Sequence, residues 1–113
     1  MYGLIKDWDT SEVTDMSYLF CASDEDDDSY NYIDYCNAAA SSFDDDITLW
    51  DTSSVKDMSN MLSYATLFNG DLAKWDVSKV ENTYRMFRRA NSFNVDVSKW
   101  DVSNVVDMSG MFM

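Results

Sequence analysis

The dipeptide Trp-Asp recurs along this chain, and the spacing of its copies limits the possible folds more than any other feature. The copies begin at Trp8, Trp50, Trp75 and Trp100. The last three are 25 residues apart, and the first gap of 42 residues is one period plus an insertion of 17 residues. A fixed period of this length marks a repeat array, in which each unit buries its apolar side against its neighbours. We therefore predict one repeat domain over residues 1–113, with the insertion at 23–39.

Comparing the units position by position separates inward-facing columns from solvent-facing ones. Four columns are identical in every unit, as in Trp50, Asp51, Ser53 and Val55. The column before the tryptophan changes freely between acidic, apolar and basic residues. We expect the tryptophans to lie in register along a dry core that the flexible methionine side chains help to fill, and the variable columns to face water.

The periodicity within a unit changes halfway along it. In the segment 58–65, apolar residues occupy positions i, i+3, i+4 and i+7, which predicts a helix of about two turns. Asp57 precedes this segment and can cap it. Upstream, the segment 72–77 alternates between apolar and polar residues as a short strand does. These patterns predict an α/β solenoid of about four units, each a strand, a turn and a short helix, with the last unit incomplete.

The repeat also resembles a known family. Residues 93–112 read Phe-Asn-Val-Asp-Val-Ser-Lys-Trp-Asp-Val-Ser-Asn-Val-Val-Asp-Met-Ser-Gly-Met-Phe. This motif is similar to the 25-residue repeat of the BspA-type leucine-rich-repeat surface proteins. The same repeat occurs in mycoplasma surface lipoproteins of unassigned function. The resemblance implies a leucine-rich-repeat-like solenoid on the cell surface or outside the cell, and it implies no catalytic activity. The third unit departs from the pattern at 81–85, and the first departs through its insertion.

Charge and composition exclude several classes of function. The chain carries 21 acidic against 8 basic residues, a formal net charge of −13 at pH 7. Such a chain repels phosphate backbones and anionic lipid surfaces, so we expect neither a nucleic-acid partner nor membrane insertion. It also has no histidine, the commonest general base. We predict that the protein is not an enzyme and needs no cofactor, with calcium as the one candidate ion.

The recurring aspartates have two interpretations. Equivalent residues of stacked units would lie about 4.8 Å apart, where bare carboxylates repel each other. Hydrogen bonds from backbone N–H groups in turns would compensate that repulsion. Alternatively, calcium would do so, because it accepts several oxygen ligands in irregular geometry. We favour the structural interpretation.

The insertion is acidic and rich in tyrosine. Asp24, Asp26 and Asp28 alternate as in a calcium-binding EF-hand loop, but Ser29 and Tyr35 stand where that loop needs glycine and glutamate. A solvated acidic loop, a loose divalent-ion site and a docking site for a basic partner remain open. The tyrosines that could contact a ligand are Tyr30, Tyr32 and Tyr35.

Two cysteines bracket this insertion, Cys21 and Cys36. In an oxidising compartment we expect them to form a disulfide, and otherwise they would remain free thiols.

The candidate recognition residues are basic. All three arginines, Arg85, Arg88 and Arg89, fall in the third unit, where they either pair with nearby acids or form a recognition patch. The lysines that we expect on the solvent side are Lys74, Lys79 and Lys99.

We predict a non-catalytic surface or secreted module that presents an extended face to a protein or glycan, for binding or adhesion. The alternative is a calcium-dependent structural or adhesive protein that uses the aspartate columns and the acidic loop. Terminal units of repeat arrays normally carry a polar outer face, and both ends of this chain lack one. We therefore expect the chain alone either to be marginally stable or to associate end to end.

Overall fold

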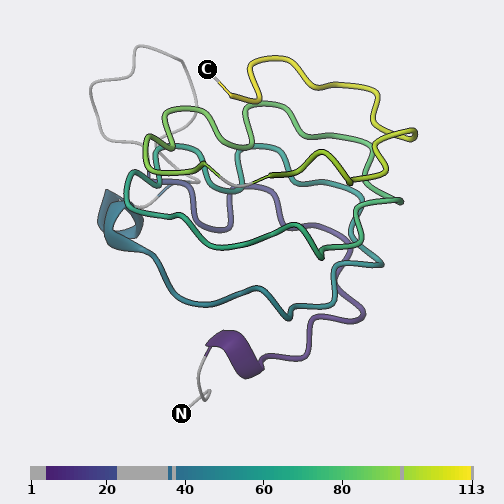
Figure 1. Ribbon diagram of the computed structural model, residues 1–113, viewed down its shortest axis with the longest axis horizontal. Coiled ribbons are helices and arrows are strands. Elements are labelled where there is room, and N and C mark those ends of the chain that lie inside the picture. The colour runs from purple at the N-terminus through teal and green to yellow at the C-terminus, as the bar shows by residue number, and fades with distance from the viewer. Residues whose placement is uncertain (1–4, 23–35, 37, 95, 113) are drawn as a thin grey trace.

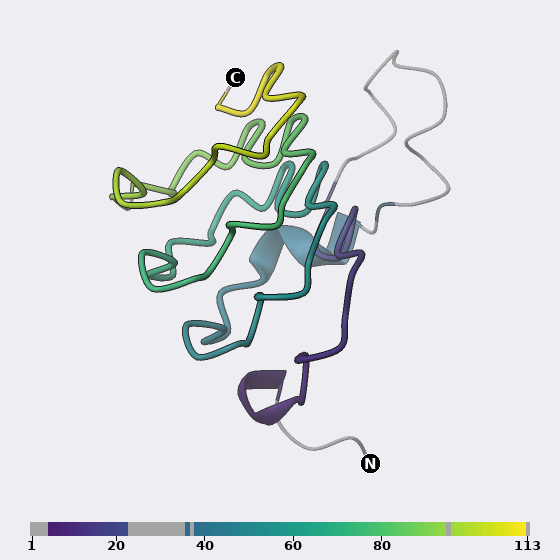
Figure 2. The same cartoon turned by 90° about the vertical axis from the view of Figure 1, so that its right-hand side faces the viewer.

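The repeat units lie side by side along the molecule, each against the next (Figure 1). The computed structural model describes residues 5–22, 36, 38–94 and 96–112. The view turned by 90° shows the same loops following one another from the N-terminal to the C-terminal side (Figure 2). Isolated parallel bridges join Asp15 to Asp57, Asp57 to Asn82 and Asn82 to Asp107. These four residues occupy one column of the repeat, so the period of the sequence is also the register of the packing.

The predicted α/β architecture is wrong. Within the described residues the regular elements are two 3-10 helices, η1 (Ile5–Asp7) and η2 (Ala38–Ser42), without an α-helix, a strand or a sheet. The described part of the chain therefore lacks a leucine-rich-repeat-like solenoid of strands and short helices, and its units are chains of tight turns in a body of 37 × 34 × 24 Å. None of the helices in the described part of the chain has the length and apolar character that a bilayer crossing requires.

The segment predicted to be helical alternates between two kinds of hydrogen bond. The N–H groups of Met61, Ser63 and Ala65 each donate to the carbonyl three residues earlier, at 3.1–3.2 Å. Those of Asn60, Leu62 and Tyr64 donate instead to the following unit, at 2.7–2.9 Å. An α-helix needs every N–H to donate four residues back. Asn60 and Tyr64 also have φ angles of 56° and 63°, in the left-handed region, and each ends a turn before a helix can extend.

The segment predicted to be a strand is also a turn. The Trp75 N–H donates to the Leu72 carbonyl at 3.1 Å, and both side chains are buried while Lys74 between them is exposed. A three-residue turn returns every third side chain to the same side. The apolar pattern was therefore correct about burial and wrong about the backbone that produces it.

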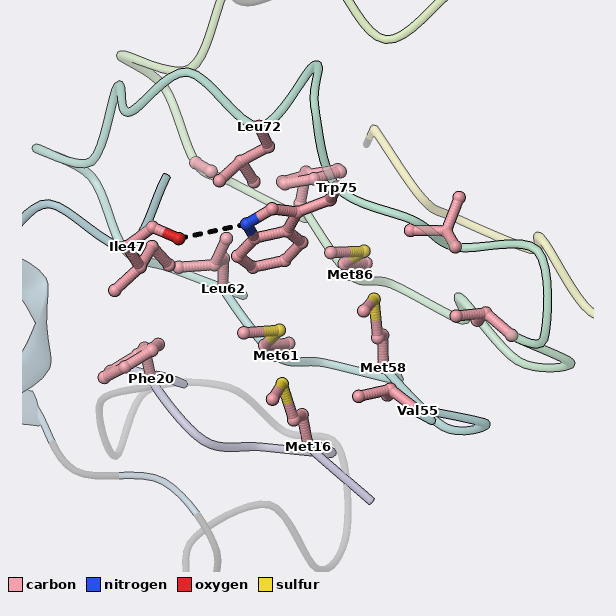
Figure 3. Packing of buried hydrophobic residues seen from close by; sticks show 14 of the residues in the cluster. Met16, Phe20, Ile47, Val55, Met58, Met61, Leu62, Leu72, Trp75 and Met86 are labelled. Atoms are coloured by element: carbon pink, nitrogen blue, oxygen red, sulfur yellow. Dashed lines mark hydrogen bonds between the residues drawn. The ribbon is translucent and has the colours of Figure 1, made fainter. Parts of the chain in front are cut away.

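The core lies between the two sides of the stacked units (Figure 3). Trp50, Trp75 and Trp100 are 4–8% exposed, which confirms the predicted burial, whereas Trp8 in the first unit is 41% exposed. The Trp75 indole N–H donates to the Ile47 carbonyl at 3.0 Å, and Trp50 and Trp100 make the equivalent bond. Each indole thus satisfies its one polar group on the preceding unit, as a buried tryptophan requires.

Phenylalanine rings form a second column through the interior. The rings of Phe43 and Phe68 stack at 5.7 Å between centroids, and those of Phe68 and Phe93 at 6.2 Å. Phe68 is fully buried, and its ring also lies against Gly70, where an added Cβ would come within 2.8 Å of it. A side chain added at this position would therefore force the Phe68 ring to shift.

Candidate binding surface

The aspartate after each tryptophan organises a turn with the serine that follows it. Asp51 Oδ1 accepts the backbone N–H of Ser53 at 3.0 Å and its hydroxyl at 2.5 Å. Asp9 and Asp76 make the same pair of bonds with the serines of their own units. Because one carboxylate replaces a backbone acceptor in each turn, this column is explained by local structure.

Two further columns hold the backbone in the same way. Asp46, Asp71 and Asp96 accept the N–H two residues ahead at 2.8–3.0 Å. Asp15, Asp57 and Asp107 do so at 2.8–2.9 Å. Asp57 was predicted to cap a helix, and it performs the same bonding at the start of a turn instead.

The hydrogen bonds set the acidity of these carboxyls. The Ser53 hydroxyl and then its N–H lower the pKa of Asp51 below the ordinary value, while the neighbouring Asp9 and Asp76 charges oppose that shift. The pKa of Asp76 and of Asp101 is lowered by the corresponding serines. Local bonds therefore outweigh the repulsion between stacked carboxylates.

Metal binding by these columns lacks support in the described part of the chain, where no group of three or more Asp, Glu, Cys or His side chains is placed to hold an ion. The proposed loop ligands, Asp24, Asp26 and Asp28, lie outside the described residues. So do Tyr30, Tyr32 and Tyr35.

The two cysteines are joined. Cys21 and Cys36 form a disulfide with a Cα–Cα distance of 4.8 Å across a sequence separation of 15 residues. Cys21 is buried at 1% exposure, and Cys36 is half-buried. The bond therefore ties the far end of the insertion to the interior of the first unit.

Two of the arginines lie on tyrosine rings. The Arg85 guanidinium carbon is 4.8 Å from the centre of the Tyr84 ring, and that of Arg88 is 5.5 Å from the centre of the Tyr64 ring. Both arginines are half-buried, and Arg89 is exposed. We call Tyr64, Tyr84, Arg85 and Arg88 the arginine–tyrosine surface.

The lysines lie elsewhere in the repeat and are exposed. Lys79 is close enough to Asp76, and Lys99 to Asp96, to lower the pKa of those carboxyls further. Lys74 is in the same column as Lys99, before the next tryptophan. The lysines thus accompany the aspartate turns, whereas the arginines accompany tyrosines.

Sequence reasoning missed the tyrosine partners and one buried polar residue. Tyr64 and Arg88 belong to different units, and their contact depends on the bond from the Tyr64 N–H to the Arg88 carbonyl at 2.7 Å. Alignment of the columns places Tyr64 beside Arg89, and the offset of one residue in the bonds between units brings Arg88 to it instead. Asn60 is 1% exposed, and its side-chain amide has no hydrogen-bond partner. Its column includes Gly110, also at positive φ, which was the available signal for its backbone.

Neither the curated proteins nor the solved structures include a match to this chain. A family model described as "Mycoplasma protein of unknown function, DUF285" matches residues 2–33 and 31–113. Since these matches cover nearly the whole sequence, the chain belongs to this DUF285 family.

Proposed function

We propose that the protein is a non-catalytic binding module whose arginine–tyrosine surface contacts a protein or glycan ligand. The observation that carries this proposal is the seating of Arg85 and Arg88 on the rings of Tyr84 and Tyr64. A guanidinium stacked on a ring loses less side-chain entropy when it binds, and arginine and tyrosine are the residues that most often dominate interfaces. On a chain of net charge −13, this concentration of arginine is also a local exception.

The scaffold supports such a role. Buried columns and aspartate turns repeat with little change, while exposed columns differ from unit to unit, so the outer surface can vary without disturbing the interior. Nothing in the described residues marks one carboxylate pair as a catalytic acid and base, because each acid column repeats the same bonds.

We further propose a location on the cell surface or outside the cell, for binding or adhesion. The resemblance to BspA-type surface proteins supports this location. The disulfide between Cys21 and Cys36 supports it too, since such bonds persist in oxidising compartments.

The test compares two triple variants that remove the same charge. R85S/R88S/R89S changes the arginines, and K74S/K79S/K99S changes the exposed lysines. Each protein is applied to an array of sialylated and sulfated glycans and to a displayed peptide library, after thermal melting has shown that it is folded. We expect the wild type and the lysine variant to bind the same ligands, and the arginine variant to lose at least about tenfold in affinity.

Equal binding by both variants would overturn the assignment to the arginine–tyrosine surface. Ligand recovered in a chemically altered form, by mass spectrometry, would overturn the non-catalytic assignment.

A further inference from the structure

One asparagine of the chain is followed by glycine, in the pair Asn69–Gly70. In such a pair the backbone nitrogen of the glycine can attack the side-chain amide carbon of the asparagine, because glycine has no Cβ to obstruct the approach. Every other asparagine precedes a residue with a Cβ. In a folded protein the reaction depends on the exposure of the pair and on the hydrogen bonds of its two reacting groups.

The attacking nitrogen and the leaving group are both available. Asn69 is exposed and Gly70 is half-buried, and both lie outside the 3-10 helices. The Gly70 N–H donates to no acceptor among the described residues, and neither does the side-chain NH2 of Asn69. The Gly70 nitrogen can therefore lose its proton to solvent without breaking a hydrogen bond, and Nδ2 of Asn69 can leave directly into water.

The side-chain oxygen of Asn69 is bound at the contact between two neighbouring units, which we call a junction. The N–H of Asn94, in the same column of the next unit, donates to Oδ1 of Asn69 at 3.0 Å. This donor can stabilise the negative charge that develops on Oδ1 when the amide carbon is attacked, as the donors of an oxyanion hole do. The same bond restrains rotation of the side chain, but a single exposed hydrogen bond is a weak restraint.

We propose that Asn69 is a site of spontaneous modification in the folded protein. The Gly70 nitrogen loses its proton to hydroxide and forms a bond with Cγ of Asn69. The bond from Cγ to Nδ2 breaks, and Nδ2 takes up a proton from water and leaves as ammonia, so that a five-membered cyclic imide remains. Water then opens the imide at one of its two carbonyl carbons. Opening at Cγ gives aspartate at position 69, and opening at the main-chain carbonyl carbon gives isoaspartate, in which the chain continues through the side chain.

The junction distinguishes these two products. In the preceding unit Asp44 occupies this column, and its Oδ1 accepts the N–H of Asn69 at 3.1 Å, as Oδ1 of Asn69 accepts the N–H of Asn94. An aspartate at position 69 therefore keeps the junction bond. Isoaspartate adds a methylene to the main chain and displaces Gly70, which lies so close to the Phe68 ring that an added Cβ would come within 2.8 Å of it. We therefore expect only the isoaspartyl product to weaken the fold.

The test follows the modification over time. The wild type and the variant N69D are kept folded in a mildly alkaline buffer, which favours loss of the Gly70 proton, and the wild type is also kept in urea. Peptide mass spectrometry measures, at each asparagine, the mass gain from replacement of NH2 by OH. Fragmentation by electron transfer separates aspartate from isoaspartate. Asn94 is the internal control, because it is exposed in the same column and is followed by valine.

In the folded protein we expect Asn69 to be converted at least about tenfold faster than Asn94, and at no less than about a tenth of its own rate in urea. N69D should gain no mass at position 69. Conversion of Asn69 in urea but not in the folded protein would overturn the proposal, as would equal rates at Asn69 and Asn94. Neither result depends on the proposed ligand.

Urea unfolding tests the difference between the products. N69D should unfold at the same urea concentration as the wild type, because it keeps the bond to Asn94. The isoaspartyl fraction, separated by chromatography, should unfold at a lower urea concentration. A destabilised N69D, or an isoaspartyl fraction as stable as the wild type, would contradict the role assigned to the junction.

Discussion

At the scale of single residues, an aspartate carboxylate oxygen takes the place of the backbone carbonyl that accepts a hydrogen bond in an ordinary turn. Each aspartate after a tryptophan binds the N–H two residues ahead, with the same geometry in all four units. The chain has no proline and three glycines, so it lacks the usual turn formers and relies on Asp and Asn in their place. The charge of −13 follows in part from this construction.

The turn carboxylates predict a direction for the dependence of stability on pH. Among the aspartates that the structure describes, seven have a pKa below the ordinary value of 3.8, each because the residue two ahead donates to it. The folded state then binds fewer protons than the unfolded state in this range. Their stabilisation is present above the unfolded pKa and is lost as pH falls through the folded pKa. We expect the melting temperature in 0.2 M salt to fall steadily as pH is lowered below about 4.

The triple variant D51N/D76N/D101N provides the comparison. Asparagine keeps an acceptor oxygen at each turn and does not titrate, so the fall should be shallower than in the wild type. A wild type most stable near pH 3 would contradict the interpretation.

The left-handed backbone at Asn60 leads us to expect that glycine is more stable than alanine at this position. Its φ of 56° costs an L-residue with a side chain about 1–2 kcal/mol relative to glycine. Asn60→Ala and Asn60→Gly both remove the unpartnered amide, and they differ in one methyl group. We expect the glycine variant to be more stable than the alanine variant by about 1 kcal/mol in urea unfolding. Equal stabilities would show that the left-handed backbone relaxes when the amide is removed.

At the scale of elements, the unit is a series of three-residue turns, and this explains which sequence predictions succeeded. Spacing identified the buried side chains correctly, because Met58, Met61, Leu62 and Ala65 are all fully buried. The same spacing arises from a helix and from consecutive turns, so it could not identify the backbone. What separates the two is the left-handed φ at Asn60 and Tyr64, and tyrosine gives no sign of it. The tertiary junction supplies the hydrogen bonds that select the turns.

The phenylalanine column predicts a large loss of stability on truncation. Phe68 is fully buried between Phe43 and Phe93, so Phe68→Ala should lower the free energy of unfolding by about 3–5 kcal/mol. The neighbouring Leu67 is 56% exposed, and Leu67→Ala should change stability by no more than about 0.5 kcal/mol. Chemical denaturation of both variants provides the measurement. Similar losses at the two positions would contradict the role of the column.

At the scale of the whole molecule, one continuous hydrophobic cluster runs through all the units. The sequence was sufficient to predict this continuity, since the columns that stay apolar are the ones that form the cluster. It was not sufficient to predict the pairing of Arg88 with Tyr64, which depends on the register between units. The residues of the core could therefore be predicted from the sequence, whereas the pairing of surface residues could be seen only in the structure.

The disulfide predicts how much stability the link across the insertion provides. Closing a loop of this length contributes about 3 kcal/mol by restricting the unfolded chain. The variant C21A/C36A should lose about that amount relative to the oxidised wild type in urea unfolding. Adding a reductant should weaken the wild type and leave the variant unchanged. A variant as stable as the oxidised wild type would show that the link adds nothing to the fold.

The identical bonding at each junction has a genetic consequence. A whole period inserted or removed between two existing units brings the same partners together again, so the length of the stack can change without any compensating substitution. Unequal recombination within such a gene would therefore yield folded proteins that differ in their number of stacked units. Variation in repeat number is the form of diversity that this architecture tolerates best.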